Sequence, residues 1–394
     1  MINDALLQSL HSHLAGWGLR QFTSDEGYFQ WQRDILSPSE ITALHQRMEG
    51  KRSGSSVDEV SFYDAAAHPK IQSVLYSQRY DYYVAIGPRV ADGLGEARSI
   101  LDVGCGVGIL TTFYARQYPD KTFVGIDRSP ASIARAQEQA NALGLTNVQF
   151  ACLDLDRTTP PGPFEMILAT HALVQAEQDS GIPSRSWKTF ERTGEILQQA
   201  DFERRTGIGA RLDRLCALLT AEGRMIVFEK TRQLARRVPL QRALAARGLG
   251  LIKQPELIRY SLVEDIADDG PFYVMERGAS RQCHWDELPE PDEGRPFDRV
   301  KAKTGSTDPD APLYENHYPS AQLVWTQLHG KQVLKETTSQ EPDGRQLHVE
   351  LGQAEEGIYL YCANTFDQRQ LVIVEPARKG MLESYYQEIT SLPL

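Results

Sequence analysis

Short apolar segments alternate with amphipathic segments from Ser99 to about Arg277, and this alternation constrains the fold more than any other feature. SILDVG is short and apolar, ILTTFYARQYP has helical spacing and ends at a proline, and TFVGID is again short and apolar. Such alternation predicts right-handed crossovers and a parallel sheet covered by helices on both faces. We therefore predict an α/β domain whose mostly parallel sheet has about seven strands.

The patterning divides the 394 residues into regions, as expected for a chain too long for one simple core. Residues 1–74 have weaker helical spacing and predict an N-terminal helical extension. The alternating domain occupies residues 75–280, and residues 281–312 have the proline, glycine and charge content of a linker. Residues 313–394 form a predicted small C-terminal β-rich domain.

The C-terminal prediction rests on successive strand patterns without helices between them. AQLVWTQL, KQVLKETT, RQLHVEL, GIYLYCAN and QLVIVEP are separated by turn signals, which favours an antiparallel sheet or a barrel. The last helical pattern, MLESYYQEI, is expected to close the chain.

Charge and cysteine usage narrow the class of protein. A net charge of -11 and a pI near 5.4 disfavour nucleic acid and anionic membranes as partners. No basic region followed by a long apolar run opens the sequence, and no stretch of about 18 apolar residues occurs, so no membrane association is predicted. The cysteines have neither paired spacing nor a zinc pattern, which favours a reducing, cytoplasmic location. They are Cys105, Cys152, Cys216, Cys283 and Cys362.

The run LDVGCGVG places Gly104, Gly106 and Gly108 between the end of a strand and the start of a helix. Backbone N–H groups and the positive end of the helix dipole meet there, and the absence of side chains lets a ligand touch the backbone. In an open parallel sheet, ligands bind at this carboxyl-terminal edge. Tight turning and helix packing are the alternative explanation for the glycines.

Carboxylates at the ends of neighbouring strands indicate a nucleoside pocket. Asp127 ends the next strand, about 20 residues past the loop, where a carboxylate can bind both ribose hydroxyls. Asp154 ends the strand after that. A dinucleotide fingerprint would need a third glycine at position 109, which is Ile109. Asp102 beside the loop would repel a diphosphate and favour an ammonium or sulfonium ion.

These motifs resemble those of the class I S-adenosylmethionine-dependent methyltransferases, which have a Rossmann-like seven-stranded core. The resemblance covers about residues 75 to 280, and it implies that S-adenosyl-L-methionine is the cofactor. It implies that Gly104, Gly106 and Gly108 approach the methionine and ribose parts and that Asp102 holds the amino end of the methionine part.

The resemblance further implies that Asp127 binds the ribose hydroxyls and that Asp154 and the Leu155 backbone face the adenine. After the fourth strand, Thr170 and His171 stand where the family presents cofactor and substrate contacts.

Methyl transfer from a sulfonium is an in-line displacement that needs alignment and exclusion of water, and a base only where the acceptor must lose a proton. His171 is the candidate base, and a structural histidine is the alternative. Tyr80 and Tyr83, with Tyr76 and Tyr82, are candidates for the wall of an acceptor pocket; packing is the alternative. No cluster has the spacing of metal ligands, so no metal is predicted.

The absence of two sequence patterns narrows the range of possible methyl acceptors. No Asn-Pro-Pro-Tyr loop follows MILATHAL, and neither Cys105 nor Cys152 follows a proline, so neither pattern of nucleic-acid methyltransferases is present. Residues 175–210 are more than one crossover helix needs and predict a lid or acceptor-binding helices, with a solvated pair of surface helices as the alternative. We predict a methyltransferase for a small or medium-sized metabolite. The alternatives are a protein or peptide methyltransferase that docks its substrate on the C-terminal domain, which could equally form a homodimer, and a non-catalytic cofactor-binding scaffold.

Overall fold

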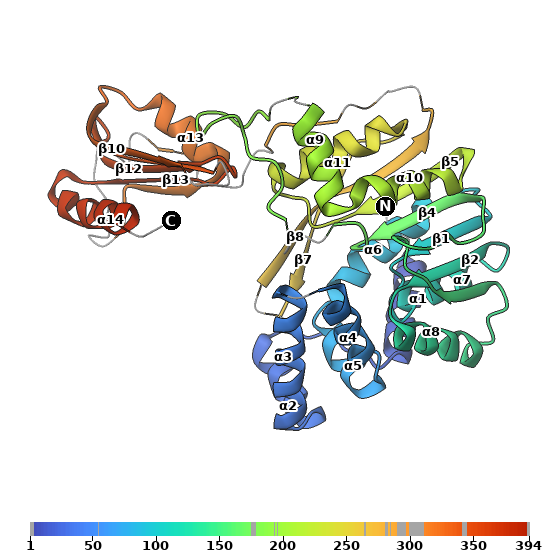
Figure 1. Ribbon diagram of the computed structural model, residues 1–394. Helices are drawn as coiled ribbons and strands as arrows, with labels where there is room; N and C mark the ends of the chain where they lie inside the picture. Colours follow the sequence, from blue (N-terminus) through green and yellow to red (C-terminus); the bar gives the residue numbers. More distant parts are fainter. Residues whose placement is uncertain are drawn as a thin grey trace. The chain divides into compact units, whose positions relative to one another are not determined.

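The computed structural model describes residues 4–53, 55–174, 179–192, 194, 196–263, 265–279, 283, 285–289, 297–298, 311–340 and 345–391. The chain forms two compact units. Unit 1 comprises Met1–Asp179, Glu203–Arg232 and Leu240–Trp285, and it contains most of the helices and strands coloured blue to yellow in Figure 1. Unit 2 comprises Ser180–Phe202, Gln233–Pro239 and Asp286–Leu394.

The centre of unit 1 is a mixed sheet that confirms the predicted α/β class (Figure 1). Its strand order is β3-β2-β1-β4-β5-β8-β6, with β7 paired to β8. Strands β1 to β5 pair in parallel, and β8 runs antiparallel to β5. The strands are β1 (Ser99–Val103), β2 (Thr122–Asp127), β3 (Val148–Cys152), β4 (Phe164–Thr170), β5 (Leu219–Phe228), β6 (Leu249–Leu251), β7 (Glu256–Leu262) and β8 (Asp265–Arg277).

The sheet has eight strands rather than about seven because one apolar stretch divides in two. GLGLIKQPELIRYSL forms β6 and β7. These two strands pair with different lengths of the long strand β8: β6 ends with Leu251 opposite Met275, and β7 begins with Glu256 opposite Phe272.

Helices precede the sheet and connect its strands. The N-terminal extension shares a core with the sheet, since Leu10 and Leu14 belong to the same apolar cluster as Ile100 and Phe228. The helices are α1 (Asp4–Gly16), α2 (Asp25–Ile35), α3 (Pro38–Ser53), α4 (Ser56–Ala66), α5 (Pro69–Ser77), α6 (Tyr80–Gly93), α7 (Ile109–Gln117), α8 (Pro130–Ala142), α9 (Ile196–Thr206), α10 (Ile208–Leu218) and α11 (Leu234–Ala246). None of the described helices has the length and apolar character needed to cross a membrane.

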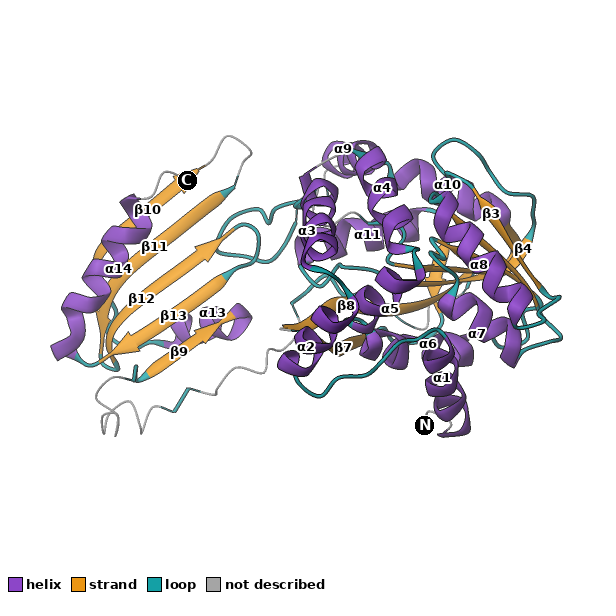
Figure 2. Ribbon diagram, turned by 90° about the horizontal axis from the view of Figure 1, so that it is seen from below, coloured by secondary structure: helices purple, strands orange, loops and turns teal. Residues whose placement is uncertain are grey.

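Unit 2 contains an open antiparallel sheet in the order β10-β11-β12-β13-β9, so the predicted sheet forms and the barrel does not. Helix α13 (Tyr318–Gln327) packs against one set of the sheet's apolar side chains. Helix α14 (Lys379–Ser391) packs against the other set (Figure 2). The strands are β9 (Tyr314–His317), β10 (Gln332–Gln340), β11 (Gln346–Ala354), β12 (Gly357–Asn364) and β13 (Arg369–Val374).

One strand prediction was wrong. AQLVWTQL lies in α13, not in a strand. Pro319 occupies the first turn, where a proline starts a helix well, and Ala321, Val324 and Leu328 then recur at helical spacing and are buried. The apolar content suggested a strand, but the spacing of three and four fits a helix.

Two further predictions fall partly outside the described residues. Residues 281–282, 284, 290–296 and 299–310 of the predicted linker are not described, nor are residues 175–178, 193 and 195 of the predicted lid.

Candidate active site

A cavity of about 420 Å³ in unit 1 opens where β1, β2, β3, β4 and β5 end. The segments that follow these strands form one part of its lining, and residues from the N-terminal helices form the other. The lining residues of the strand-end segments are Gly104–Val107, Ile109, Asp127–Ser129, Leu153–Asp156, Thr170–Ala172 and Glu229–Lys230.

The glycine loop brings its backbone to the cavity at Gly104 and Gly106. Both have positive φ, of 68° and 55°, which disfavours any side chain. A Cβ atom at Gly106 would meet nothing within 4 Å, whereas one at Gly104 would lie 2.8 Å from the Ala172 Cβ. The loop therefore leaves open space at Gly106 and lies against the segment after β4 at Gly104.

Gly108 serves a different purpose from the other two glycines. It is the N-cap of α7, with φ of 81°, and it is not among the residues that line the cavity. A Cβ atom there would lie 2.9 Å from the Ala136 Cβ and 3.0 Å from the Phe150 ring. Gly108 thus allows α7 to begin close to α8 and β3.

Asp127 lines the cavity at the end of β2 and fixes the glycine loop. Its Oδ2 accepts a hydrogen bond from the Gly106 N–H at 3.0 Å, and its Oδ1 accepts one from the Ser129 N–H at 2.9 Å. Burial raises the pKa of Asp127, while these two bonds oppose the rise. Ser129 itself caps α8, as its hydroxyl accepts from the Ser132 N–H. Asp127 is therefore not needed as the cap of that helix.

Asp102 lines the cavity at the end of β1 and is buried. Its Oδ2 accepts a hydrogen bond from the Thr111 hydroxyl at 2.5 Å. Burial raises the pKa of Asp102 to about 7, with the Thr111 bond lowering it and the nearby Asp127 raising it. No cation pairs with Asp102 among the residues that the structure describes. A positively charged ligand group would supply the missing partner.

Asp154 and Leu155 line the cavity after β3. Asp154 Oδ1 accepts from the Asp156 N–H at 2.9 Å, and Arg157 lies 3.6 Å from its other oxygen. The Leu155 carbonyl accepts from Arg214 at 2.5 Å. These bonds fix the segment after β3 that carries the buried Leu155 side chain.

Thr170 ends β4, and His171 follows it in the left-handed region with φ of 56°. The His171 N–H donates to the Phe228 carbonyl at 2.8 Å, and its ring stacks on Tyr82 with centroids 5.0 Å apart. The Arg79 guanidinium lies 3.2 Å from His171 Nδ1. Since a guanidinium can only donate, Nδ1 accepts this bond, which leaves the proton of the neutral ring on Nε2.

Sequence reasoning missed Glu229, which follows β5 and is fully buried. Its carboxylate accepts from the Ala172 and Leu173 N–H groups at 2.8 Å and from the Val174 N–H at 3.3 Å. Burial raises the pKa of Glu229 to about 7, against the effect of these bonds. Glu229 thus fixes the segment that carries His171. A carboxylate directly after the apolar run MIVF was the available signal.

The helical part of the lining includes Tyr76, Tyr82 and Tyr83, three of the four tyrosines considered for an acceptor wall. Tyr80 is not among the lining residues; it is buried, and its hydroxyl lies 2.8 Å from His11 Nδ1. Arg79 was missed. It lines the cavity, and its guanidinium carbon lies 5.5 Å from the centre of the Tyr82 ring.

Residues 100–183 match the family model described as a methyltransferase domain. Malonyl-[acyl-carrier protein] O-methyltransferase of Acetivibrio thermocellus is 31% identical over 113 residues, covering 27% of this chain and 38% of that protein. Trans-aconitate 2-methyltransferase of Streptomyces avermitilis is 33% identical over 86 residues, covering 22% and 32%. A tRNA (guanine-N(7)-)-methyltransferase of Rubrobacter xylanophilus is 37% identical over 67 residues, covering 17% and 30%.

Among solved structures, magnesium protoporphyrin IX methyltransferase from Synechocystis with bound S-adenosylmethionine aligns with a TM-score of 0.34 and 16% identity. The alignment covers 66% of this chain and 99% of that one.

The matched segment begins in β1, contains the glycine loop and continues past β4. Residues 100–183 are therefore similar to a methyltransferase domain. The chain spans only about a third of the length of the curated relatives named above.

Proposed function

We propose that this protein transfers a methyl group from S-adenosyl-L-methionine to a small-molecule acceptor that carries a carboxylate. We infer the acceptor class from a single observation, the position of Arg79, whose cationic side chain lines the cavity beside His171. Within the described part of the chain, Arg79 pairs with no carboxylate.

The strand ends suit the cofactor. Bound S-adenosylmethionine supplies a methyl group on a positively charged sulfur, which leaves as a neutral thioether when the methyl group moves to the acceptor. Asp102 would bind the ammonium of the methionine part, because it is a buried carboxylate without a cationic partner among the described residues. Asp127 would accept from the ribose hydroxyls, and the open space at Gly106 admits the cofactor against the backbone.

Asp154, Leu155 and Thr170 complete the cofactor side of this proposal. Asp154 and Leu155 would lie beside the adenine, with the buried Leu155 side chain supplying an apolar contact. Thr170 would lie at the end of β4, between the cofactor and the acceptor.

The helical part of the lining suits an anionic acceptor. A partly buried guanidinium is costly without a counter-ion, and a ligand carboxylate would remove that cost and accept a paired hydrogen bond. Tyr82 supports the guanidinium through its ring face, and Tyr76 and Tyr83 supply apolar surface around it. Exclusion of water by these rings would strengthen the charge pair.

His171 has a positioning role in this proposal rather than the role of a base. Its Nδ1 lone pair already accepts from Arg79, so the ring holds the guanidinium in place. A carboxylate acceptor has no proton to lose at neutral pH, and its methylation requires no base. Glu229 supports this arrangement through the backbone after β4.

The names of two relatives support the proposal, since malonyl groups and trans-aconitate both carry carboxylates. Other relatives are named for RNA, which is the alternative acceptor class. The net charge of -11 of this chain favours a small metabolite over RNA. Protein acceptors and a non-catalytic scaffold remain outcomes of the test below.

The test is to incubate the purified protein with methyl-labelled S-adenosylmethionine and an extract of its source organism. The extract is first separated into anionic metabolites, other metabolites, RNA and protein, and each fraction is incubated by itself. Because methylation neutralises a carboxylate, each metabolite fraction is prepared before the reaction and used separately as the acceptor. Transfer with the anionic fraction is the expected result. Transfer only with RNA or protein would overturn the acceptor class, and binding of S-adenosylhomocysteine without transfer to any fraction would favour the scaffold.

A further inference from the structure

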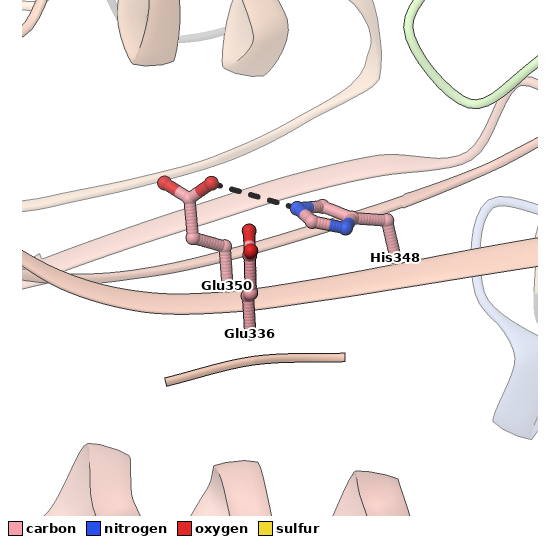
Figure 3. Close-up of side chains that lie close together, drawn as sticks. All are labelled: Glu336, His348 and Glu350. Carbon is pink, nitrogen blue, oxygen red and sulfur yellow. Dashed lines mark ion pairs between the residues drawn. The ribbon is translucent and has the colours of Figure 1, made fainter. Parts of the chain in front are cut away.

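One histidine and two glutamates lie close together on the sheet of unit 2. His348 and Glu350 are on β11, and Glu336 is on the neighbouring strand β10 (Figure 3). One ligand atom from each of the three lies within 4.8 Å of the others. Among the described residues, this is the group in which three such atoms come so close.

The strand register explains why these side chains meet. Glu336 is opposite Glu350, and Thr338 is opposite His348, in the antiparallel pair of β10 and β11. Directly opposed carboxylates repel each other, which disfavours strand pairing. A cation held between Glu336 and Glu350 would convert this repulsion into an attraction.

His348 has the surroundings of a metal ligand. The residue is 2% exposed, and Nδ1 lies 2.8 Å from the Thr338 hydroxyl. Nε2 makes no hydrogen bond, although it lies 3.5 Å from Glu350 Oε2. The hydroxyl can accept from Nδ1–H, which directs the Nε2 lone pair toward the carboxylates. Metal-ligating histidines are oriented in the same way by a partner on the other ring nitrogen.

Glu350 is oriented by two aromatic donors. Its Oε1 accepts from Trp325 Nε1 at 3.0 Å and from the Tyr359 hydroxyl at 2.6 Å. These two bonds leave Oε2 of Glu350 directed toward His348, at 3.5 Å from its Nε2.

We propose that unit 2 binds one divalent transition-metal ion, with Zn²⁺ as the representative, through Glu336, His348 and Glu350. The imidazole ligand favours such ions over Mg²⁺ and Ca²⁺, which prefer oxygen ligands alone. The bound ion would stabilise the pairing of the edge strand β10 with β11. Neither this site nor its occupant is part of the proposed methyl transfer.

The test is a calorimetric titration of the chelator-treated, full-length and tag-free protein with ZnCl₂. One ion per chain is expected, with Mg²⁺ unable to compete at a large excess. Glu336→Gln is the principal variant because this side chain is exposed and can be changed without disturbing the core. Both Glu336→Gln and His348→Gln are expected to weaken binding at least about 100-fold, as loss of one of three ligands should exceed a typical outer-shell effect.

The matched control is His329→Gln. His329 belongs to a second histidine–glutamate pair in unit 2, with Nδ1 at 2.9 Å from Glu356 Oε1, and its loss should leave zinc affinity unchanged. Thr338→Val should weaken binding about tenfold through the orientation of His348. Absence of stoichiometric binding, or equal affinity of the wild type and Glu336→Gln, would overturn the proposal.

A second readout comes from Trp187, whose ring is stacked on His348 with centroids 3.6 Å apart. Co²⁺ bound at His348 should quench the emission of Trp187, and Trp187→Phe should remove that component of the quenching. Quenching that persists in both Trp187→Phe and His348→Gln would place the ion elsewhere and contradict the proposed site.

Discussion

The two sides of the unit 1 cavity differ in charge and in origin. The strand side contains Asp102, Asp127 and Asp154, which follow three parallel strands, and its cations include Arg211, which pairs with Asp156. The helix side comes from helices that precede the sheet and contains Lys51 and Arg79 together with tyrosines, while its carboxylate Glu59 pairs with Arg128. An acidic side beside a cationic side suits two ligands of opposite local charge, a cationic methyl donor and an anionic acceptor.

The largest expected effect is on the strand side, from Asp127→Ala. This change leaves the Gly106 and Ser129 N–H groups without their acceptor and removes the proposed ribose contact. Losses of about 1–3 kcal/mol for each unsatisfied group predict at least about 30-fold weaker binding of S-adenosylhomocysteine by calorimetry. Asp120→Ala, at an exposed carboxylate before β2, is the control. Unchanged affinity of Asp127→Ala would remove Asp127 from the site.

The corresponding change on the helix side is Arg79→Met, which keeps length and removes charge. Loss of a charge-assisted hydrogen bond of about 1.5–3 kcal/mol predicts a KM for the acceptor that is roughly 10- to 100-fold higher. Affinity for S-adenosylhomocysteine should stay near the wild-type value. Arg89→Met, which breaks a partly exposed ion pair between Arg89 of α6 and Glu256 of β7, should change neither quantity. A rise in the cofactor Kd with an unchanged acceptor KM would reverse the assignment of the two sides.

The pH dependence of cofactor binding tests the role of the strand side in the wild-type protein, because it changes the charge of Asp102 and leaves the side chain in place. With the pKa of Asp102 at about 7, the carboxylate that would bind the ammonium forms only as the pH rises through that value. Affinity for S-adenosylhomocysteine should therefore increase about tenfold from pH 6 to pH 8. Asp102→Asn should bind more weakly at pH 8 and lose this dependence. An equally steep profile in Asp102→Asn would assign the titration to another group.

The same pKa has an opposite consequence for the stability of the ligand-free protein. The folded state binds the Asp102 proton more tightly than the unfolded state, because burial raises the pKa. The stabilisation from this group is present at low pH and is lost as the pH rises from about 4 to 7. Denaturant unfolding of wild type and Asp102→Asn across this range should show the difference.

The smallest effect is expected at Tyr80, which lies outside both sides of the cavity. Tyr80→Phe removes the contact between its hydroxyl and His11 and should lower the free energy of unfolding by about 1 kcal/mol. The kcat and the KM should remain within about twofold of wild type, a change of less than about 0.5 kcal/mol. A much larger loss of kcat would give Tyr80 the catalytic role that the sequence suggested.

The strand side could be located from the sequence because its residues follow local rules. Each carboxylate stands at the end of an apolar run, and parallel strands bring these ends to one edge of the sheet. The spacing from the glycine loop to Asp127 lies within one strand–helix–strand unit. These relations span a few tens of residues and depend on regular geometry.

The helix side could not be located in this way. Arg79 meets His171 across 92 residues, and Glu229 meets Ala172 across 57. No periodicity in the sequence specifies such contacts, because they depend on how the helices pack on the sheet. Tyr76, Tyr80, Tyr82 and Tyr83 looked alike in the sequence, and packing alone separated Tyr80 from the others.

Unit 2 shows the same division between local and long-range information. Four of its strands and its last helix were predicted from alternation and turn signals. The cluster of Glu336, His348 and Glu350 depends on the register of β10 with β11, which the sequence does not specify. An alternating His-Val-Glu on one strand was the available signal.

The structure of the protein with bound S-adenosylhomocysteine tests the central claim most directly. The account predicts ribose hydroxyls at about 3 Å from the Asp127 carboxylate and the amino group at a similar distance from Asp102. It also predicts that the sulfur faces Arg79 and His171. A ligand whose ribose lies away from Asp127, or whose sulfur faces away from Arg79, would contradict the division of the cavity into a donor side and an acceptor side.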